Sequence, residues 1–275
     1  MIRLFLIEWK KTFYNRGTRI FLILYFLMIV AMGLILPNFH PNINGIAVDF
    51  IKMKALEYPV IWHNIAWLMG FGKFFLAVIL INNISNEYSF GTVKQNLIDG
   101  FSKGEFFLSK LLLAFLLSLF STFILIGIVV ILGSLYSENQ HAFGGFAFAF
   151  GLLIEVFGYL VMAMFLTFLL RKSTFAILLL VVLSFGETMV KGIEYLVRYS
   201  ALENAPEQLK LWSTYLPFEV NSSVVDYPSV DIGKFLMTGE FFIPKPFDWA
   251  ICSVAIVYCI LFIALSYWLF KKRDV

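Results

Sequence analysis

Three ionisable side chains, Lys73, Glu155 and Glu187, lie within long apolar stretches of the sequence. A basic group that faces lipid at the bilayer centre costs about 2.5–3.5 kcal/mol on insertion scales, so such groups are expected to face protein or water. Charges at this depth support one of two kinds of chemistry. They form ion pairs that hold helices together, or they relay ions or protons along a pathway.

Small residues flank two of these charges at helical steps of three and four positions, namely Ala66, Gly70 and Ala77 around Lys73, and Ala147, Gly151 and Gly158 around Glu155. Small residues let helix backbones approach closely in membranes, so both charges are expected on packed interfaces. We predict an ion pair between Lys73 and Glu155 with a structural role, and contact with a substrate is the alternative. Glu187 lies near the end of its apolar stretch and could simply reach water.

The elements that carry these charges follow from composition. The 275 residues are 60% hydrophobic and 14% charged, against roughly 45–50% apolar and about 25% charged in soluble proteins. A soluble enzyme is therefore excluded, and a net charge of +3 is too small to imply nucleic-acid binding. The apolar residues come in blocks of about twenty, the length that crosses a bilayer core of about 30 Å. The fold class is all-α integral membrane.

Six apolar segments are predicted to be transmembrane helices within a single permease domain, 1–275; they cover residues 20–36, 60–82, 111–135, 146–170, 174–190 and 248–270. Cytoplasmic flanks of spanning helices retain lysine and arginine. Thirteen basic residues lie on the side that holds both termini and seven on the other. Both termini are therefore predicted to be cytoplasmic.

Three segments outside the spans also have predicted structure. Residues 1–19 combine a broken apolar stripe with basic residues, as in a helix lying on the membrane surface, although a plain basic flank is the alternative. Residues 83–110 form the one sizeable cytoplasmic loop and contain a short amphipathic helix suited to docking a soluble partner. The outer loop, 192–247, is rich in aromatic residues and is predicted to fold.

Catalytic and metal-binding patterns are not found in the sequence. It has no G-x-x-x-x-G-K-[ST] phosphate-binding loop, so the chain does not bind ATP in that way. The three histidines, His40, His63 and His141, fall at or beyond the outer ends of spans and match no metal-ligand spacing. We expect them to be solvated and predict no metal site and no catalytic residue.

The cytoplasmic loop carries an E-x-x-x-G-T element at residues 87–92, a turn at residues 100–103, and Ser-Lys-Leu-Leu at residues 109–112. With the six-span layout, these residues make the chain resemble the membrane (permease) subunit of ATP-binding-cassette exporters, the type-2 permease family. Two departures are Phe101 and Lys103, where the family often has proline and arginine. The outer loop is also longer than in the minimal members.

The resemblance implies that the segment from residue 86 to residue 97 is a coupling region on the surface of an ATPase. The residues it assigns to ATPase coupling are Asn86, Glu87, Tyr88, Gly91, Thr92, Val93, Lys94, Asn96 and Leu97. Glu87 would offer a carboxylate to basic or backbone donors, and Gly91 would form a tight turn.

The resemblance also implies partners and a location. ATP and Mg would be held by a separate ABC ATPase subunit, with no cofactor in this chain, and a second permease, identical or paralogous, would complete a dimer. The protein would be a multi-pass protein of the bacterial cytoplasmic (plasma) membrane that exports a substrate the sequence does not name.

Two other functions stay open from the sequence. An ion- or proton-coupled transporter or channel would use Lys73, Glu155 and Glu187 as its relay. A membrane assembly or immunity protein without transport activity would use the folded outer loop.

Overall fold

The structure is a computed structural model that describes residues 14–38, 42–43, 46–47, 50–51, 53–98, 100–139, 141–201, 211–230 and 241–273. The predicted surface helix over residues 1–19 lies almost wholly outside the described residues. The described part is a bundle of helices with one very short hairpin, which confirms the all-α membrane fold.

Five helices of the described residues are long and apolar enough to cross a membrane. They are α2 (Arg16–Asn38), α6 (Lys103–Tyr136), α7 (Ala147–Leu170), α8 (Ser173–Ala201) and α11 (Trp249–Lys272). Two shorter helices, α3 (Val60–Gly70) and α4 (Lys73–Ser89), meet at a bend of 41°. Counting this bent pair as one span gives six crossings, so the chain is a multi-pass membrane protein.

Helix α7 is the centre of the bundle. It packs against α3, α4, α6, α8 and α11, and most of its residues are buried. A helix that is apolar all round is expected to be surrounded by other helices. By contrast, α2 packs on α4, and both α2 and α8 expose large apolar side chains along their length. These outer helices suit contact with lipid.

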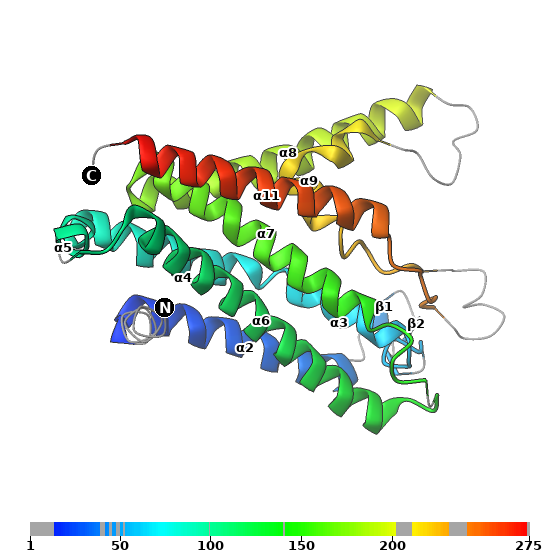
Figure 1. Ribbon diagram of the computed structural model, residues 1–275. Coiled ribbons are helices and arrows are strands. Elements are labelled where there is room, and N and C mark those ends of the chain that lie inside the picture. The colour runs from blue at the N-terminus through cyan, green and yellow to red at the C-terminus, as the bar shows by residue number, and fades with distance from the viewer. Residues whose placement is uncertain are drawn as a thin grey trace.

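The two ends of the bundle differ in structure (Figure 1). At one end lie the start of α2, the short helix α5 (Thr92–Ile98), the turn between α7 and α8, and the end of α11. We call this the α5 end. Toward the opposite end, which we call the α9 end, the 3₁₀ helix η1 (Trp212–Tyr215) and α9 (Pro217–Ser222) pack on α8, and α9 also packs on α7 and α11. The antiparallel strands β1 (Asn42–Ile43) and β2 (Ile46–Ala47) lie farther along, at the tip of this end (Figure 1).

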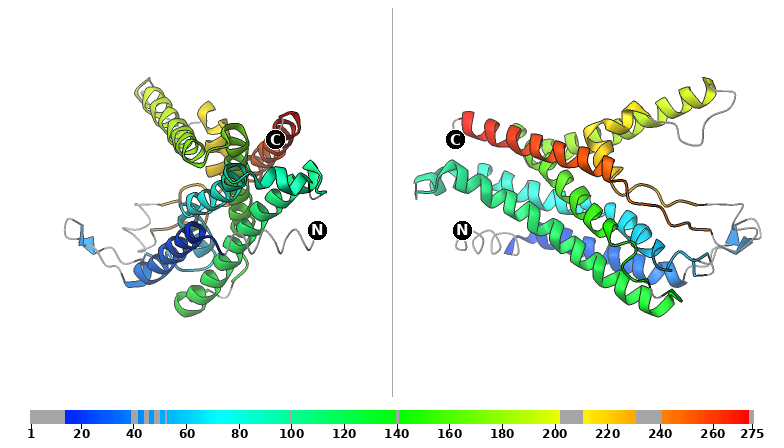
Figure 2. Two further views of the ribbon diagram at one scale, coloured as in Figure 1. Left: turned by 90° about the vertical axis from the view of Figure 1, so that its left-hand side faces the viewer. Right: turned by 45° about the vertical axis from the view of Figure 1, so that its right-hand side comes forward.

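Two helices extend well beyond their apolar blocks. The apolar block of α8 ends at residue 190, but the helix continues to Ala201. This last part of α8 leads away from the bundle (Figure 2). Helix α6 begins at Lys103, because Ser102 and Glu105 form a capping box in which each side chain accepts a hydrogen bond from the backbone N–H of the other. Hydropathy alone marks neither of these ends.

Candidate functional site

The carboxylate of Glu87 is buried at the α5 end of the bundle. Its Oε1 atom lies 2.6 Å from the Nζ of Lys110, which also donates to Asn83 Oδ1 at 2.9 Å. Glu87 is 5% exposed and Lys110 is 0% exposed. Removing one partner of such a buried pair typically costs about 3–5 kcal/mol, since the other charge is left uncompensated. Glu87 therefore fastens the end of α4 to α6.

The turn after Glu87 depends on Gly91. This residue has a φ of +68°, the left-handed region that glycine adopts without strain. On either side of it, the N–H of Phe90 donates to the carbonyl of Asn86 at 2.9 Å, and Thr92 Oγ1 donates to the carbonyl of Glu87 at 3.3 Å. The E-x-x-x-G-T element is thus an anchored, sharply turned connection between α4 and α5.

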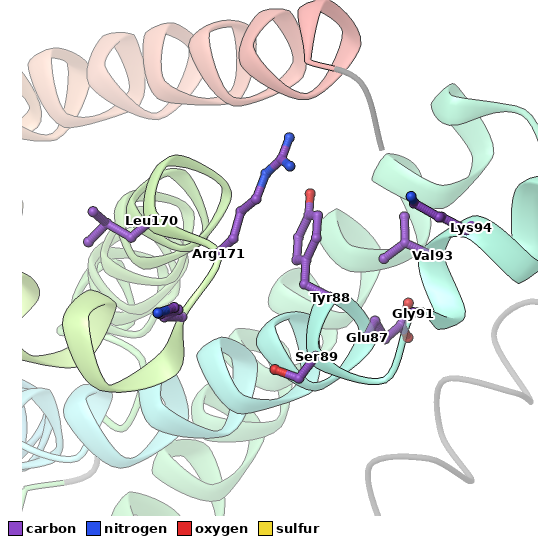
Figure 3. Close-up of a pocket in the computed structure, with 9 residues that line it drawn as sticks. Glu87, Tyr88, Ser89, Gly91, Val93, Lys94, Leu170 and Arg171 are labelled. Atoms are coloured by element: carbon purple, nitrogen blue, oxygen red, sulfur yellow. The ribbon is translucent and has the colours of Figure 1, made fainter.

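A surface hollow of about 680 Å³ lies between this turn and the turn that joins α7 to α8 (Figure 3). Its lining residues are Glu87, Tyr88, Ser89, Gly91, Val93, Lys94, Leu170, Arg171 and Lys172. The guanidinium of Arg171 lies 5.3 Å from the centre of the Tyr88 ring, a cation–π distance. The hollow is therefore lined on one side by the predicted coupling region and on the other by the basic residues that follow α7.

The other residues predicted for coupling differ in exposure. Val93 is buried, Asn96 is half-buried and Lys94 is exposed, while Leu97 lies within α5. Two apolar residues absent from that prediction, Phe90 and Ile98, are 78% and 84% exposed. The sequence offers no signal that separates them from other apolar residues of the loop, such as Val93 and Phe101. Among the loop side chains whose burial the structure describes, they are the most exposed large apolar ones.

Two basic residues hold the helix ends together beside this loop. Lys103, at the start of α6, donates to the carbonyls of Lys271 and Arg273, each at 3.3 Å. Arg273 in turn donates to the carbonyls of Phe168 and Leu169 at the end of α7, at 3.3 and 2.7 Å. Cations at helix C-termini satisfy free carbonyls and oppose the negative end of the helix dipole. The α5 end is therefore a platform of mutually attached helices.

A second polar site lies deeper in the bundle, where α3 and α4 meet. Lys73 Nζ is 2.6 Å from Glu155 Oε1 and also donates to Ser222 Oγ at 2.9 Å. This confirms the predicted ion pair. A Cβ atom added at Gly70 would lie 3.0 Å from Glu155 Oε1, so the glycine gives the carboxylate its room. Both side chains are largely buried, at 14% and 4% exposure.

Glu187 does not simply reach water, as its position in the sequence allowed. Its Oε2 atom accepts hydrogen bonds from the N–H groups of Phe218 and Glu219, at 2.8 and 3.0 Å. These are free donors of the first turn of α9, so a carboxylate from another helix caps that turn. The outer loop folds back onto α8, and hydropathy does not reveal such a contact.

A polar stripe on α8 extends this attachment. Lys191 pairs with Glu219 at 2.6 Å, and Glu194 accepts hydrogen bonds from the N–H groups of Trp212 and Ser213 at 3.1 and 2.9 Å. Glu187, Lys191 and Glu194 are spaced by four and three positions and so share one face of α8. This face holds η1 and α9 in place and accounts for the length of α8.

The histidines have different surroundings. The expectation of a solvated side chain is wrong for His63, which is buried, stacks on Phe148 at 4.3 Å between ring centres, and has its Nε2 atom 2.8 Å from the carbonyl oxygen of Asp226. The outer loop covers it. His141 is exposed, and His40 lies outside the described residues. Within the described part of the chain, no three His, Cys, Asp or Glu side chains are grouped to hold a metal ion.

Comparison with known protein families places the chain beside one of them over nearly its whole length. The model of a protein family described as "ABC-2 family transporter protein" matches residues 2–275, nearly the whole chain. No curated protein matches the chain.

Proposed function

The chain belongs to the ABC-2 family of transporter membrane proteins, and from this premise we propose that it is the export permease of a transporter driven by a separate ATPase. Membrane subunits of this family typically lack ATPase activity of their own. The sequence also contains no G-x-x-x-x-G-K-[ST] loop. The energy for transport would then come from a second protein that binds ATP and Mg.

The buried pair between Glu87 and Lys110 is the observation that carries this proposal. It connects the turn at Gly91 directly to α4, the second half of the bent span, and to the long helix α6. A force applied to α5 from the cytosol would be passed to both helices, because breaking the pair would expose each charge to an apolar interior. This is the mechanical requirement for coupling a soluble motor to a membrane gate.

We place the ATPase contact on the exposed side of the same loop. Phe90, Lys94 and Ile98 are exposed there, beside the hollow that Arg171 and Lys172 line. Protein interfaces are anchored by a few large apolar, aromatic or arginine side chains that become fully desolvated. Phe90 and Ile98 would be such anchors, and the basic residues would meet acidic groups of the ATPase.

The working cycle follows from this arrangement. ATP binding would close two ATPase subunits, and two coupling loops from two permeases, identical or paralogous, would convert that closure into opening of the far side. Such an alternation requires ligands that bind the two states unequally. In this arrangement the α5 end faces the cytosol and the membrane is the bacterial cytoplasmic membrane.

The rival function, an ion or proton relay, receives less support from the positions of its three residues. Lys73 and Glu155 bind each other, and Glu187 caps α9. Groups held in structural contacts are poorly suited to passing ions from one to the next.

Affinity purification tests the proposal. The chain would be co-expressed with the protein of a neighbouring reading frame that carries a phosphate-binding loop, and isolated in mild detergent. We expect a stable complex whose ATP hydrolysis depends on the permease. Elution of the chain alone, or transport by the purified chain without ATPase, would contradict the proposal.

A further inference from the structure

A cavity of about 520 Å³ lies toward the α9 end of the bundle, where α7, α8 and α9 meet the junction of α3 and α4. Small-molecule sites usually measure about 300–1,000 Å³ and combine apolar walls with a few polar groups. Seven aromatic residues line this cavity: Trp67, Phe71, Phe74, Tyr159, Phe185, Phe218 and Tyr227. Its size and walls therefore fit a drug-sized or lipid-sized molecule.

The ion pair between Lys73 and Glu155 also lines this cavity. Glu155 Oε1 accepts from Lys73, but the buried Oε2 atom has no hydrogen-bond partner among the described residues. Lys73 in turn directs two of its three N–H donors to Glu155 and Ser222. Buried polar atoms are nearly always satisfied, so an unsatisfied carboxylate oxygen on a residue that lines a cavity indicates a missing donor.

A hydroxyl group matches the unsatisfied Glu155 oxygen and the neighbouring Lys73 donor at the same time. One hydroxyl both donates and accepts, and so it could donate to Glu155 Oε2 while accepting from Lys73. An ammonium group would serve only the carboxylate, and a carboxylate or phosphate would serve only the lysine.

The charges around the cavity favour an uncharged ligand for a second reason. The lining residues Lys191 and Glu219 form an ion pair with each other, and the lining residue Asp226 pairs with Lys245. Together with Lys73 and Glu155, these pairs leave no formal charge in excess. Neither a cation nor an anion would find an unbalanced counter-charge there.

We propose that this cavity binds a neutral amphipathic molecule that carries a hydroxyl group. The hydroxyl lies between Glu155 and Lys73, and the alkyl or aromatic body lies against the aromatic wall. This binding is a property of the permease chain itself and goes beyond the proposed ATP-driven function.

Photolabelling of the purified, full-length permease in lipid nanodiscs tests the proposal without any ATPase. The probe is a monoacylglycerol with a diazirine in its acyl chain, compared with a fatty acid and a fatty amine carrying the same diazirine. Mass spectrometry would locate the labelled residues. We expect labelling by the monoacylglycerol to concentrate on cavity residues, and an excess of unlabelled monoacylglycerol to remove that label.

Two substitutions on α8 provide a matched pair. Val181 lines the cavity, whereas Val182 is exposed on the surface and does not line it. V181F should lower cavity labelling about tenfold, equivalent to about 1.4 kcal/mol, and V182F should leave it unchanged. S184F, a second cavity-filling change, replaces V181F if that variant does not fold. Equal labelling in the filled and control variants, or equal cavity labelling by the charged probes, would overturn the proposal.

Discussion

Lys73 Nζ lies 2.6 Å from Glu155 Oε1, although 82 positions separate the two residues in the sequence. Lys73 is the first residue of α4, and the carboxylate of Glu155 rests against Gly70, the last residue of α3. The pair therefore joins the central helix α7 to the point where the second span bends. A second buried pair, Glu87 and Lys110, joins α4 to α6 nearer the α5 end of the bundle.

Charge reversal tests the role of the pair between Lys73 and Glu155. K73E and E155K should each place two like charges together in a buried site, and breaking such a pair costs about 3–5 kcal/mol. The double variant K73E/E155K should recover most of the folded protein, because the attraction is restored in the opposite sense. Fluorescence-detected gel filtration of the detergent-solubilised protein measures the folded fraction. A double variant no better than either single variant would show that the pair contributes nothing.

Substitutions in the pair between Glu87 and Lys110 distinguish two roles for Glu87. If the carboxylate anchors α4 to α6, E87Q should lower the melting temperature of the permease even without ATPase, since Lys110 would lose its counter-charge. The apolar double variant E87M/K110M should regain that stability, because no buried charge remains. Thermal unfolding of the purified permease in detergent provides the measurement. If Glu87 instead contacts the ATPase directly, E87Q would weaken complex formation and leave the melting temperature unchanged.

The exposed apolar residues of the loop are expected to bind the ATPase. F90A and I98A should each weaken ATPase binding by about 1–2 kcal/mol, the usual loss at an interface anchor, with no loss of permease stability because both side chains are exposed. Titration of the ATPase against permease in nanodiscs measures the affinity. F123A, at an exposed phenylalanine within α6, serves as the control. Equal affinity for all three variants would remove this surface from the interface.

The sequence predicted the parts of the fold that depend on hydrophobic length and helical spacing. Small residues at steps of three and four around Lys73 and Glu155 predicted their ion pair, because such spacing defines one helix face. Apolar residues at helical spacing in the loop over residues 83–110 predicted a short amphipathic helix, which is α5. These features are local or follow directly from burial in a bilayer.

Tertiary contacts of the outer loop explain most of what the sequence did not predict. The backbone donors of residues 218 and 219 bind Glu187, and the carbonyl of Asp226 binds His63. No periodic pattern encodes a contact between a side chain and a distant backbone group. The break between α3 and α4 was also not predicted. Residues 71 and 72 are Phe and Gly within a continuous apolar run, so hydropathy shows no interruption there. The helix start at the Ser102 and Glu105 capping box was not predicted either, although S-x-x-E is a sequence signature of a helix N-terminus.

The turn at Gly91 is expected to require glycine for its backbone conformation alone. A Cβ atom added at Gly91 would meet no atom within 4 Å, yet the φ of +68° would strain any other L residue by about 1–2 kcal/mol. G91A should therefore distort the loop and lower permease-dependent ATP hydrolysis by the complex. G127A is the matched control, because Gly127 lies inside α6 with equally open space and ordinary helical geometry. Full activity in G91A would show that the turn tolerates the strain or is not used in coupling.

The cap that Glu187 provides for α9 should be measurable one amide at a time. E187A removes the acceptor of two N–H groups, and losing a helix cap typically costs about 0.5–2 kcal/mol. Hydrogen–deuterium exchange of the purified permease should then quicken at Phe218 and Glu219 by about threefold to thirtyfold, while the amides of α7 keep their protection. E138Q, a change at an exposed glutamate just after α6, controls for the loss of a charge. Unchanged exchange at both amides would mean that α9 is held by its apolar contacts and by Lys191 and Glu219, and that the carboxylate of Glu187 is free for another role.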